Sequence, residues 1–141
     1  MKLDSKDYKI IKALNENSRL PIRDIAKKTN IRPSTVHQRI QKLIENKIIE
    51  KFTLKLNNDA IQENFIVFMY LITIQDLQKE FFNNKHIKEA FGITGEYDLL
   101  LKLKFKDIIE FNEFVISLRK NKSITKTITS VATVNIKEEL N

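Results

Sequence analysis

The spacing of apolar residues changes along the chain, from a helical period near its start to a strand-like period later. Between Leu3 and about Ile44 the apolar residues recur every three or four positions, which predicts helices. Asp4 is suited to cap a first helix, Pro21 to the first turn of a short second helix, and Pro33 to the start of a longer third helix. A short helix, a tight turn and a longer helix in this order predict a helix-turn-helix.

The third predicted helix and the segment after it complete the first domain. The apolar side chains of this helix fall on one stripe, made of Val36, Ile40, Leu43 and Ile44. Residues 47–58 then alternate between apolar and polar side chains, as the two strands of a wing do. The first part of the chain therefore predicts a winged helix-turn-helix domain.

From residue 65 onward the pattern is that of strands separated by helices. The expected elements are a strand at 65–74, a helix at 76–87, two strands in 88–105 around a turn at Gly95, a helix at 107–120 with Ile108, Phe111, Val115 and Leu118 on its apolar side, and a long strand at 123–137. The order βαββαβ is that of the ferredoxin-like unit. Because the first strand is apolar on both faces, we expect the helix-free face of the sheet to be covered, most simply by a second copy of the chain.

The chain is therefore predicted to be an α+β protein of two domains, one at 1–60 with a linker to about 64 and one at 65–141. Without cysteine it has no disulfides, thiolate metal sites or cysteine nucleophiles, and its two histidines lack the spacing of a zinc site. No metal and no cofactor is expected. No apolar run approaches the ~18 residues of a membrane span, and the start lacks a signal-peptide core, so we expect a cytoplasmic protein without membrane contact.

The net charge of +7 is concentrated in the first domain. Residues 1–60 hold 14 Lys and Arg against 7 Asp and Glu, whereas residues 61–141 hold 11 of each kind. Between Asp24 and Glu45 no acid occurs, but five bases do: Lys27, Lys28, Arg32, Arg39 and Lys42. This asymmetry predicts that only the first domain meets a polyanion, for which double-stranded DNA is the expected partner.

The third predicted helix carries the side chains expected to contact DNA. Opposite its apolar stripe lie Ser34, Gln38, Gln41, Lys42 and Glu45, with Thr35, His37 and Arg39 on the flanks. Glutamine pairs with adenine and Arg or Lys with guanine, whereas Ser34 and Thr35 at the helix start suit a phosphate. Lys27, Lys28 and Arg32 are expected to hold the DNA backbone. A basic amphipathic helix can also be only a solvated face, and winged helices also bind proteins; the charge asymmetry favours DNA.

Both halves of the chain resemble one known family. In the first half the resemblance rests on Leu3-Asp4, Asp7, Ile10-Ile11, Leu14, Asn17-Ser18-Arg19, Ile25-Ala26, Ile31, Pro33-Ser34-Thr35-Val36, Arg39-Ile40, Leu43 and Ile48-Ile49, and in the second on TGEYDLLLKL at 94–103. The sequence resembles the Lrp/AsnC (leucine-responsive, or feast/famine) transcriptional regulators over essentially its whole length. The resemblance implies an N-terminal DNA-binding domain, a C-terminal domain for regulation and assembly, dimers that commonly associate into octamers, and sensing of amino acids or related metabolites.

Two positions depart from the family pattern. Arg32 stands where the family usually has Ser or Thr, and an arginine cannot accept hydrogen bonds from the free amides of a helix start. We hypothesise that Arg32 exchanges this cap for a phosphate contact. Lys47 stands where the family generally has Gly, so that either Lys47 adopts a left-handed backbone or the helix ends differently, with Asn46 in that conformation.

The only glycines, Gly92 and Gly95, lie in the segment FGITGEYD. Such a turn exposes amides that can receive a carboxylate, while Asp98 can receive an ammonium group and Tyr97 can form a wall. The resemblance places Gly95, Tyr97 and Asp98 in the effector region. A plain hairpin turn, with Asp98 as a structural hydrogen-bonding group, gives the same pattern, so both interpretations stay open.

Three classes of function compete for this chain. The favoured one is a sequence-specific regulator that binds roughly palindromic DNA as a dimer or higher oligomer, modulated by an amino acid or small metabolite. An architectural DNA-binding protein would use the same basic segment and differ only in its specificity ratio. An enzyme is disfavoured, because the sequence has no nucleophile–base pair, no metal-ligand cluster and no glycine-rich phosphate loop, and therefore no candidate catalytic residue.

Overall fold

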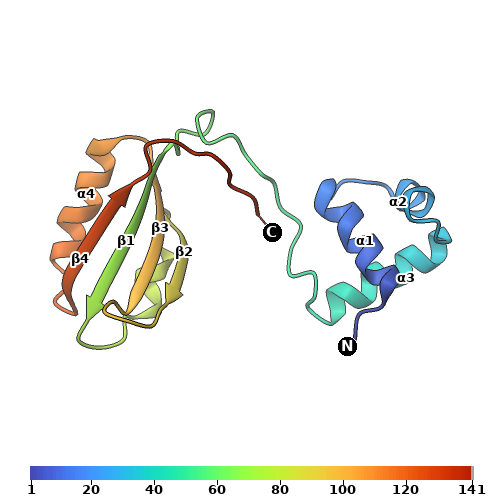
Figure 1. The fold of residues 1–141 in the computed structure, drawn as a ribbon, viewed down its shortest axis with the longest axis horizontal. Coiled ribbons are helices and arrows are strands. Elements are labelled where there is room, and N and C mark those ends of the chain that lie inside the picture. Colours follow the sequence, from blue (N-terminus) through green and yellow to red (C-terminus); the bar gives the residue numbers. More distant parts are fainter. Residues whose placement is uncertain (141) are drawn as a thin grey trace. The chain divides into compact units, whose positions relative to one another are not determined.

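The computed structural model describes residues 1–140, and these residues divide into two units, one of Met1–Lys55 together with residues 139–140, and one of Leu56–Glu138. The first unit holds three helices, α1 (Ser5–Glu16), α2 (Ile22–Thr29) and α3 (Pro33–Glu45), as the periodicity predicts (Figure 1). Their buried side chains form one core, to which Ile10, Ile25 and Leu43 contribute fully buried side chains.

Helix α1 begins with a reciprocal hydrogen-bonding arrangement between two aspartates. The Asp4 carboxylate accepts from the N–H groups of Lys6 and Asp7, at 2.9 and 3.0 Å, and the Asp7 carboxylate accepts from the Asp4 N–H at 3.0 Å. This capping box satisfies amides that have no acceptor within the helix. The cap predicted at Asp4 is therefore confirmed, and Asp7 is part of it.

Helix α3 ends on a lysine in the left-handed region. Lys47 has a φ of +56°, the Ile48 N–H donates to the Leu43 carbonyl at 2.8 Å, and the Lys47 N–H donates to the Ile44 carbonyl at 2.9 Å. This is the Schellman ending that usually has glycine at its turning residue. The alternative expectation, that Asn46 takes the left-handed conformation, is wrong: its φ is −85°, and its side-chain amide instead donates to the Lys42 carbonyl at 2.8 Å.

The wing expected over residues 47–58 does not form strands in the structure. An alternating segment becomes a strand only when a second strand satisfies its backbone groups. Residues 57–63 form turns instead, closed by the Ala60 N–H on the Asn57 side chain at 3.0 Å. The apolar side chains of the segment, Phe52, Leu54 and Leu56, remain exposed.

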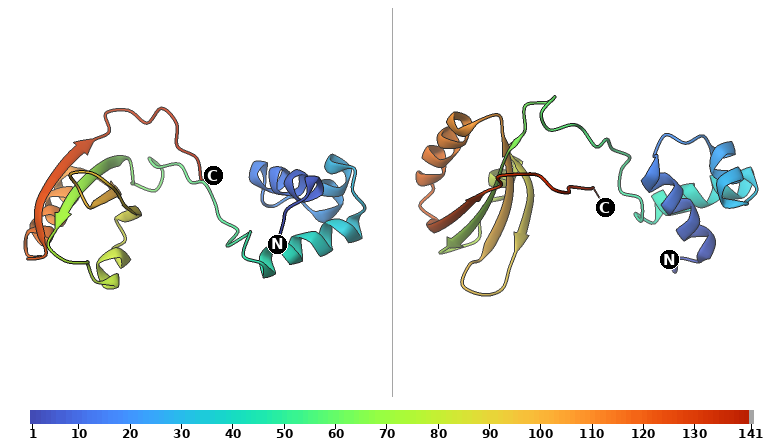
Figure 2. Two further views of the ribbon diagram at one scale, coloured as in Figure 1. Left: turned by 60° about the horizontal axis from the view of Figure 1, so that its bottom comes forward. Right: turned by 45° about the horizontal axis from the view of Figure 1, so that its top comes forward.

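The second unit is a four-stranded antiparallel sheet with helices on one face (Figures 1 and 2). Its elements are β1 (Phe65–Thr73), the 3₁₀ helix η1 (Lys79–Asn83), β2 (Ile87–Gly92), β3 (Leu99–Phe105), α4 (Ile108–Arg119) and β4 (Ile124–Val131), in the sheet order β2-β3-β1-β4. This is the ferredoxin-like arrangement, and the α+β class with an N-terminal helix-turn-helix is confirmed.

Two elements are shorter than the pattern predicted. The helix expected at 76–87 is only the 3₁₀ helix η1, because the Asn84 side chain accepts from the His86 N–H at 2.9 Å and so favours a turn there. The strand expected at 123–137 ends at Val131. After it, one further contact follows, from the Ala132 N–H to the Ile66 carbonyl at 2.9 Å, close to the beginning of β1 at Phe65.

The core of the second unit lies between α4 and one face of the sheet. The inward side chains of β1 and β3, among them Val67, Leu101 and Phe105, are fully buried against Phe114 and Leu118 of α4. The expectation that Ile108 lies on this apolar side is wrong. Ile108 is exposed in the first turn of α4, and Phe114 takes the buried position because it faces the Phe105 ring, 5.5 Å away between centroids.

The opposite face of the sheet carries no helix (Figure 2). Here β1 presents Ile66, which is buried, and Phe68, which is 37% exposed and lies opposite Ser130 of β4. Within one chain, β1 is thus not buried on both faces as predicted. We call this helix-free surface the open face.

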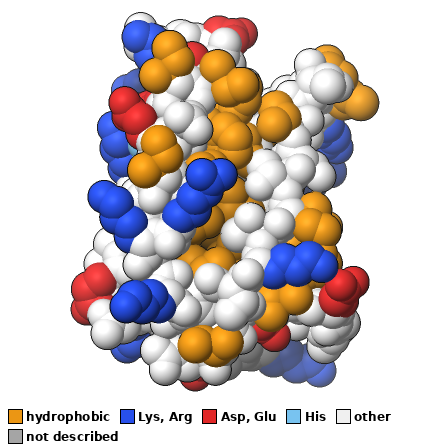
Figure 3. All heavy atoms as spheres, turned by 90° about the vertical axis from the view of Figure 1, so that its left-hand side faces the viewer, with side chains coloured by type: hydrophobic (Ala, Val, Ile, Leu, Met, Phe, Trp, Pro, Cys, Tyr) orange, Lys and Arg blue, Asp and Glu red, His pale blue; other side chains and the backbone are white. Residues whose placement is uncertain are grey.

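Hydrophobic side chains also gather in a band on the side of the second unit that carries α4 and β4, with lysines and arginines beside it (Figure 3). Helix α4 leaves Ile109 and Ile116 exposed, about two helical turns apart and therefore on the same side of the helix. This unit therefore exposes apolar side chains in addition to those buried in its core.

Replacing Lys47 by glycine is expected to raise the free energy of unfolding by about 1 kcal/mol, because glycine adopts a positive φ without the clash of a Cβ. Lys47→Ala is the control, since it removes the same charge but keeps the Cβ. Urea denaturation followed by circular dichroism measures both variants. Equal stability of the two would show that the left-handed backbone costs nothing at this position.

Candidate nucleic-acid interface and effector turn

Helix α3 exposes most of the side chains that the sequence placed opposite its apolar stripe. Val36 and Leu43 are fully buried beneath it, and Thr35 is half-buried. We call Ser34, His37, Gln38, Gln41 and Lys42 the exposed set; Glu45, at the end of the helix, is exposed as well. These side chains carry amide, hydroxyl, imidazole and ammonium groups on one surface, which is the range of donors and acceptors that base edges recognise.

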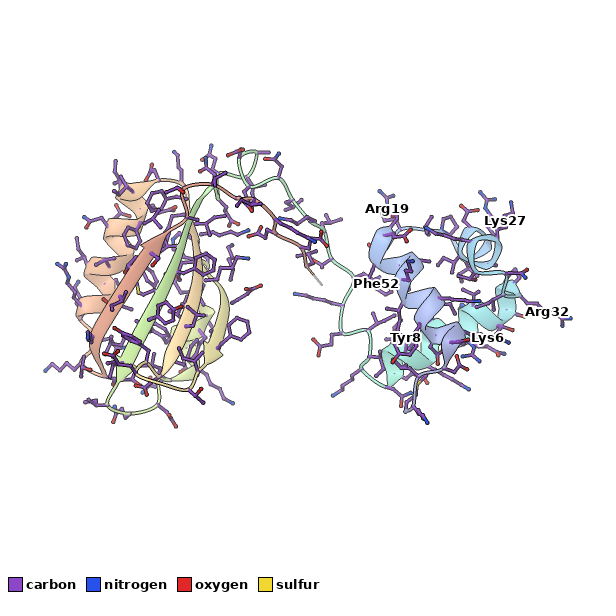
Figure 4. All side chains as sticks on the ribbon, in the orientation of Figure 1. Lys6, Tyr8, Arg19, Lys27, Arg32 and Phe52 are labelled. Carbon is purple, nitrogen blue, oxygen red and sulfur yellow. The ribbon has the colours of Figure 1, made fainter. Side chains whose placement is uncertain are left out.

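The start of α3 has free backbone amides and a basic surround. Arg32 is the N-cap and makes no side-chain capping hydrogen bond, as expected. Because the first intrahelical bond runs from the Val36 N–H to the Arg32 carbonyl, at 3.0 Å, the amides of Ser34 and Thr35 have no acceptor within the helix. Arg32, and Lys27 of α2, both exposed, project away from the unit (Figure 4). The site suits an anion.

The two neighbouring lysines of α2 differ in their surroundings. Lys27 lies exposed in the last turn of α2. Lys28 forms an ion pair with Glu16 of α1, and this contact lowers the pKa of Glu16. Of the two bases that the sequence assigned to the DNA backbone, Lys28 therefore already has a carboxylate beside it.

Arg39 points toward α1 and lies apart from the exposed set of α3. Its Nη1 donates to both carboxylate oxygens of Asp4, at 2.7 and 2.8 Å, and to Oδ1 of Asp7 at 2.8 Å. Asp7 is only 2% exposed, so its charge is compensated inside the protein by this guanidinium. We call this group of three residues the Arg39 clamp; it joins the middle of α3 to the capping box of α1.

The clamp also affects ionisation. The pKa of Asp4 is lowered, chiefly by the hydrogen bond from the Asp7 N–H and then by Arg39. The pKa of Arg39 is raised, chiefly by its hydrogen bond to Asp4 and next by that to Asp7. Because the pKa of Asp4 is lower in the folded state, its contribution to stability is complete above the ordinary pKa of aspartate and is lost as the pH falls through the lowered value.

The turn between β2 and β3 is built around Gly95, whose φ is +112°. Asp98 supports this turn: its Oδ2 accepts from the Thr73 N–H at 2.8 Å, and its own N–H donates to the Leu71 carbonyl at 2.8 Å. The carboxylate therefore ties the turn to the end of β1. Asp98 thus has the structural hydrogen-bonding role that was one of the two interpretations of the sequence.

Two residues from neighbouring strands, Tyr70 and Lys126, lie close to Tyr97 at the turn, and the sequence pattern assigned neither of them to this site. The Tyr97 ring packs on that of Tyr70, with centroids 5.5 Å apart, and Nζ of Lys126 lies 5.7 Å from its centroid. Lys126 also lies 3.5 Å from the Glu96 carboxylate, and its pKa is raised, chiefly by Tyr97 and next by Glu96. Lys126 reaches the turn because β4 pairs with β1 in a register that places Lys126 opposite Ile72, and this register is not evident from the sequence.

Among residues 1–140, no three His, Cys, Asp or Glu side chains are placed to hold a metal ion together. Nor does any helix there have the length and apolar character needed to cross a membrane.

Replacing Arg39 by methionine is expected to lower the free energy of unfolding by about 2 kcal/mol or more, because the buried Asp7 loses its cation. Lys42→Met is the matched control, since it removes one positive charge from an exposed position of the same helix. Denaturation by urea at neutral pH measures both. Equal losses in the two variants would contradict the structural importance of the clamp.

Two family models and several known proteins are similar to this chain. Residues 3–44 match the AsnC-type helix-turn-helix domain, and residues 72–141 match the Lrp/AsnC ligand binding domain. An uncharacterized HTH-type transcriptional regulator of Pyrococcus furiosus is 34% identical over 143 residues, which cover 99% of this chain and 97% of that protein. The HTH-type transcriptional regulator FL11 of the same organism is 34% identical over 118 residues, covering 80% and 78%.

Solved structures show the same fold. A transcriptional regulator from Neisseria meningitidis, crystallised as an L-Met complex, superposes with a TM-score of 0.88 at 24% identity, covering 99% of this chain and 95% of that one. For E. coli AsnC the TM-score is 0.84 at 20% identity, with 99% and 97% covered. Sequence and fold agree over both units, and this chain belongs to the Lrp/AsnC family of helix-turn-helix transcriptional regulators.

Proposed function

We propose that this chain regulates transcription by binding roughly palindromic DNA as a dimer, with α3 in the major groove. The observation that carries the proposal is the uncapped start of α3, where free amides, Arg32 and Lys27 adjoin an exposed row of hydrogen-bonding side chains. Backbone amides and bases at this end suit phosphates, and the row beyond them suits base edges.

Individual roles follow from exposure and chemistry. Arg32 and Lys27 hold phosphates together with Ser34 and Thr35. The base-edge readers are Gln38, Gln41 and Lys42, with His37 on their flank. Lys28 reaches a phosphate only by leaving Glu16.

The sequence pattern placed Arg39 among the side chains that contact DNA, and we now assign it a different role. Its guanidinium is held by two carboxylates, one of them buried, so contact with DNA would leave the charge of Asp7 uncompensated. We therefore infer that Arg39 orients α3 against α1 and does not read DNA.

Dimer formation through the open face places two copies of α3 on one duplex. The spacing of their half-sites is one helical turn of DNA, ~34 Å, or a multiple of it. We place the boundary between the DNA-binding domain of residues 1–60 and the assembly domain of residues 65–141 in the turns at 57–64. The protein acts in the cytoplasm, without a cofactor and without enzymatic activity.

An amino acid or a related small metabolite is the proposed effector, bound at Gly95, Tyr97 and Asp98. The Neisseria regulator with this fold was crystallised with L-Met. In the present chain, Oδ2 of Asp98 accepts from Thr73, so Oδ1 is the atom that we assign to an ammonium group. The amides around Gly95 are assigned to the carboxylate.

The first test compares the DNA directly upstream of the chain's own gene with a random duplex of equal length, by fluorescence anisotropy at several salt concentrations. We expect both affinities to fall steeply with salt, by about 0.9 in the logarithmic slope for each neutralised phosphate. The upstream DNA is expected to bind at least ~10³-fold more tightly. Equal affinities would favour an architectural role, and binding without salt dependence would overturn the proposal.

The same titration tests Arg32 through the variant Arg32→Ser. Loss of one phosphate contact is expected to reduce the slope by about 0.9, while the new serine cap stabilises the fold by about 1 kcal/mol. Lys122→Gln, an exposed lysine of the second unit, serves as the control and should leave the slope unchanged. An unchanged slope in Arg32→Ser would refute the phosphate contact.

The effector site is tested with Asp98→Asn, which keeps an oxygen for the Thr73 amide but loses the negative charge. We expect this variant to fold and to bind DNA, but not to respond to L-methionine or to other L-amino acids that affect the native protein. Asp98→Ala removes the turn contact as well and should lower stability. A full response in Asp98→Asn would leave the residue with its structural role alone.

A further inference from the structure

After β4 the chain turns across the open face of the sheet (Figures 1 and 2). β1 separates β4 from β3 in the sheet, yet the carboxylate of Glu138 reaches β3. Its Oε2 lies 2.8 Å from Nζ of Lys102, and its Oε1 lies 2.7 Å from Nζ of Lys104. Residues 132–138, which we call the strap, therefore pass over the beginning of β1.

The strap places an ion triad in a nearly closed environment. The side chains of Lys102, Lys104 and Glu138 are only 15%, 11% and 11% exposed. Asn58 completes the group, since it accepts from Nζ of Lys104 at 2.9 Å and donates to Oε1 of Glu138 at 3.3 Å. Charges with so little access to water are tolerated when each has a partner of opposite sign.

The remainder of the open face is apolar and balanced in charge. Tyr70 of β1 lies between Leu100 of β3 and Ile128 of β4, and Phe68, two residues earlier on β1, lies between Lys102 and Ser130. The four lysines in the strands are all paired with carboxylates, with Nζ–oxygen distances between 2.6 and 3.9 Å: Lys88 with Glu63, Lys102 with Glu138 and Glu89, Lys104 with Glu138, and Lys126 with Glu96. The face thus shows no excess of lysines over carboxylates that would attract a polyanion.

Such a surface fits a copy of itself. In a two-fold dimer the same patch contributes both sides of the interface, so any unbalanced charge near the axis meets a charge of its own sign. Juxtaposed like charges are costly at a desolvated interface. A face with apolar side chains and internally paired lysines avoids this cost.

We propose that Glu138 determines self-association, because the strap neutralises Lys102 and Lys104 within each chain and so allows two open faces to pack together. The occupant of the open face is a second copy of the chain. This inference rests on the dimer proposed above and adds the residue that balances the positive charge of the lysines at its interface. On this proposal, two chains associate only when the strap of each lies in place over β1.

The test is Glu138→Gln in the full chain, which keeps the shape of the side chain but removes its negative charge. At low salt we expect the dissociation constant of the dimer to rise by about tenfold or more, because two copies of Lys102 and Lys104 then face each other. Added salt should recover part of this loss by screening. Sedimentation velocity over a range of protein and salt concentrations measures both effects, and circular dichroism verifies folding.

Two further variants control for a loss of folding. Glu113→Gln makes the same charge change on the exposed side of α4 and should leave the dissociation constant unchanged. Lys104→Gln with Glu138→Gln removes one lysine along with the carboxylate and should recover most of the affinity. If Glu138→Gln unfolds, the double variant still tests the proposal: a folded dimer with a dissociation constant close to that of the native chain supports charge balance as the cause, and a dimer at least tenfold weaker in spite of its balanced charge overturns it.

A separate variant distinguishes failure of the strap from failure of the dimer. Phe68→Asp places a charge in the apolar part of the open face. If Phe68→Asp leaves a folded dimer intact, the open face is not the interface, and both the proposed dimer and the role of the strap fail. If Phe68→Asp separates the chains while Glu138→Gln does not change the dissociation constant, the dimer stands and only the role of the strap is wrong.

Discussion

β1 is an apolar strand with neighbours on both sides, and the second unit is arranged around the need to keep it from water. On one face, Val67, Met69 and Leu71 are fully buried in the core that Phe114 and Leu118 of α4 complete. On the other face, the strap passes over the beginning of β1, where Ile66 is buried, and Phe68 stays partly exposed. One helix, one 3₁₀ helix and one strap cannot cover both faces of a four-stranded sheet. The self-association proposed above would complete the cover of this strand.

Ionic contacts follow one rule in both units. Where a basic side chain lies against packed surface it is held by carboxylates, as Arg39 is by Asp7 and as Lys104 is by Glu138. Basic side chains that are exposed together, such as Arg32 and Lys27, gather at the start of α3. Burial thus sorts the basic residues into those that maintain the architecture and those available to an anion.

Much of the fold follows from local properties of the sequence. The first three helices were predictable because their caps, prolines and apolar stripes act over a few residues, and β3 because its leucines and lysines alternate. The wing failed because an alternating segment still needs a partner strand, and Ile108 was misplaced because spacing alone does not say which side of α4 meets Phe105. The exposed set of α3 was likewise predictable. The role of Arg39 was not, since its partners lie 35 and 32 positions earlier in the chain.

The strap makes the proposed interface depend on two distant parts of the chain. Lys102 and Lys104 belong to β3, whereas Glu138 lies 34 positions after Lys104. A partly folded copy whose strap is detached therefore presents both lysines on its open face without this carboxylate. Such copies repel one another, so the proposed pairing favours chains in which the strap is already in place.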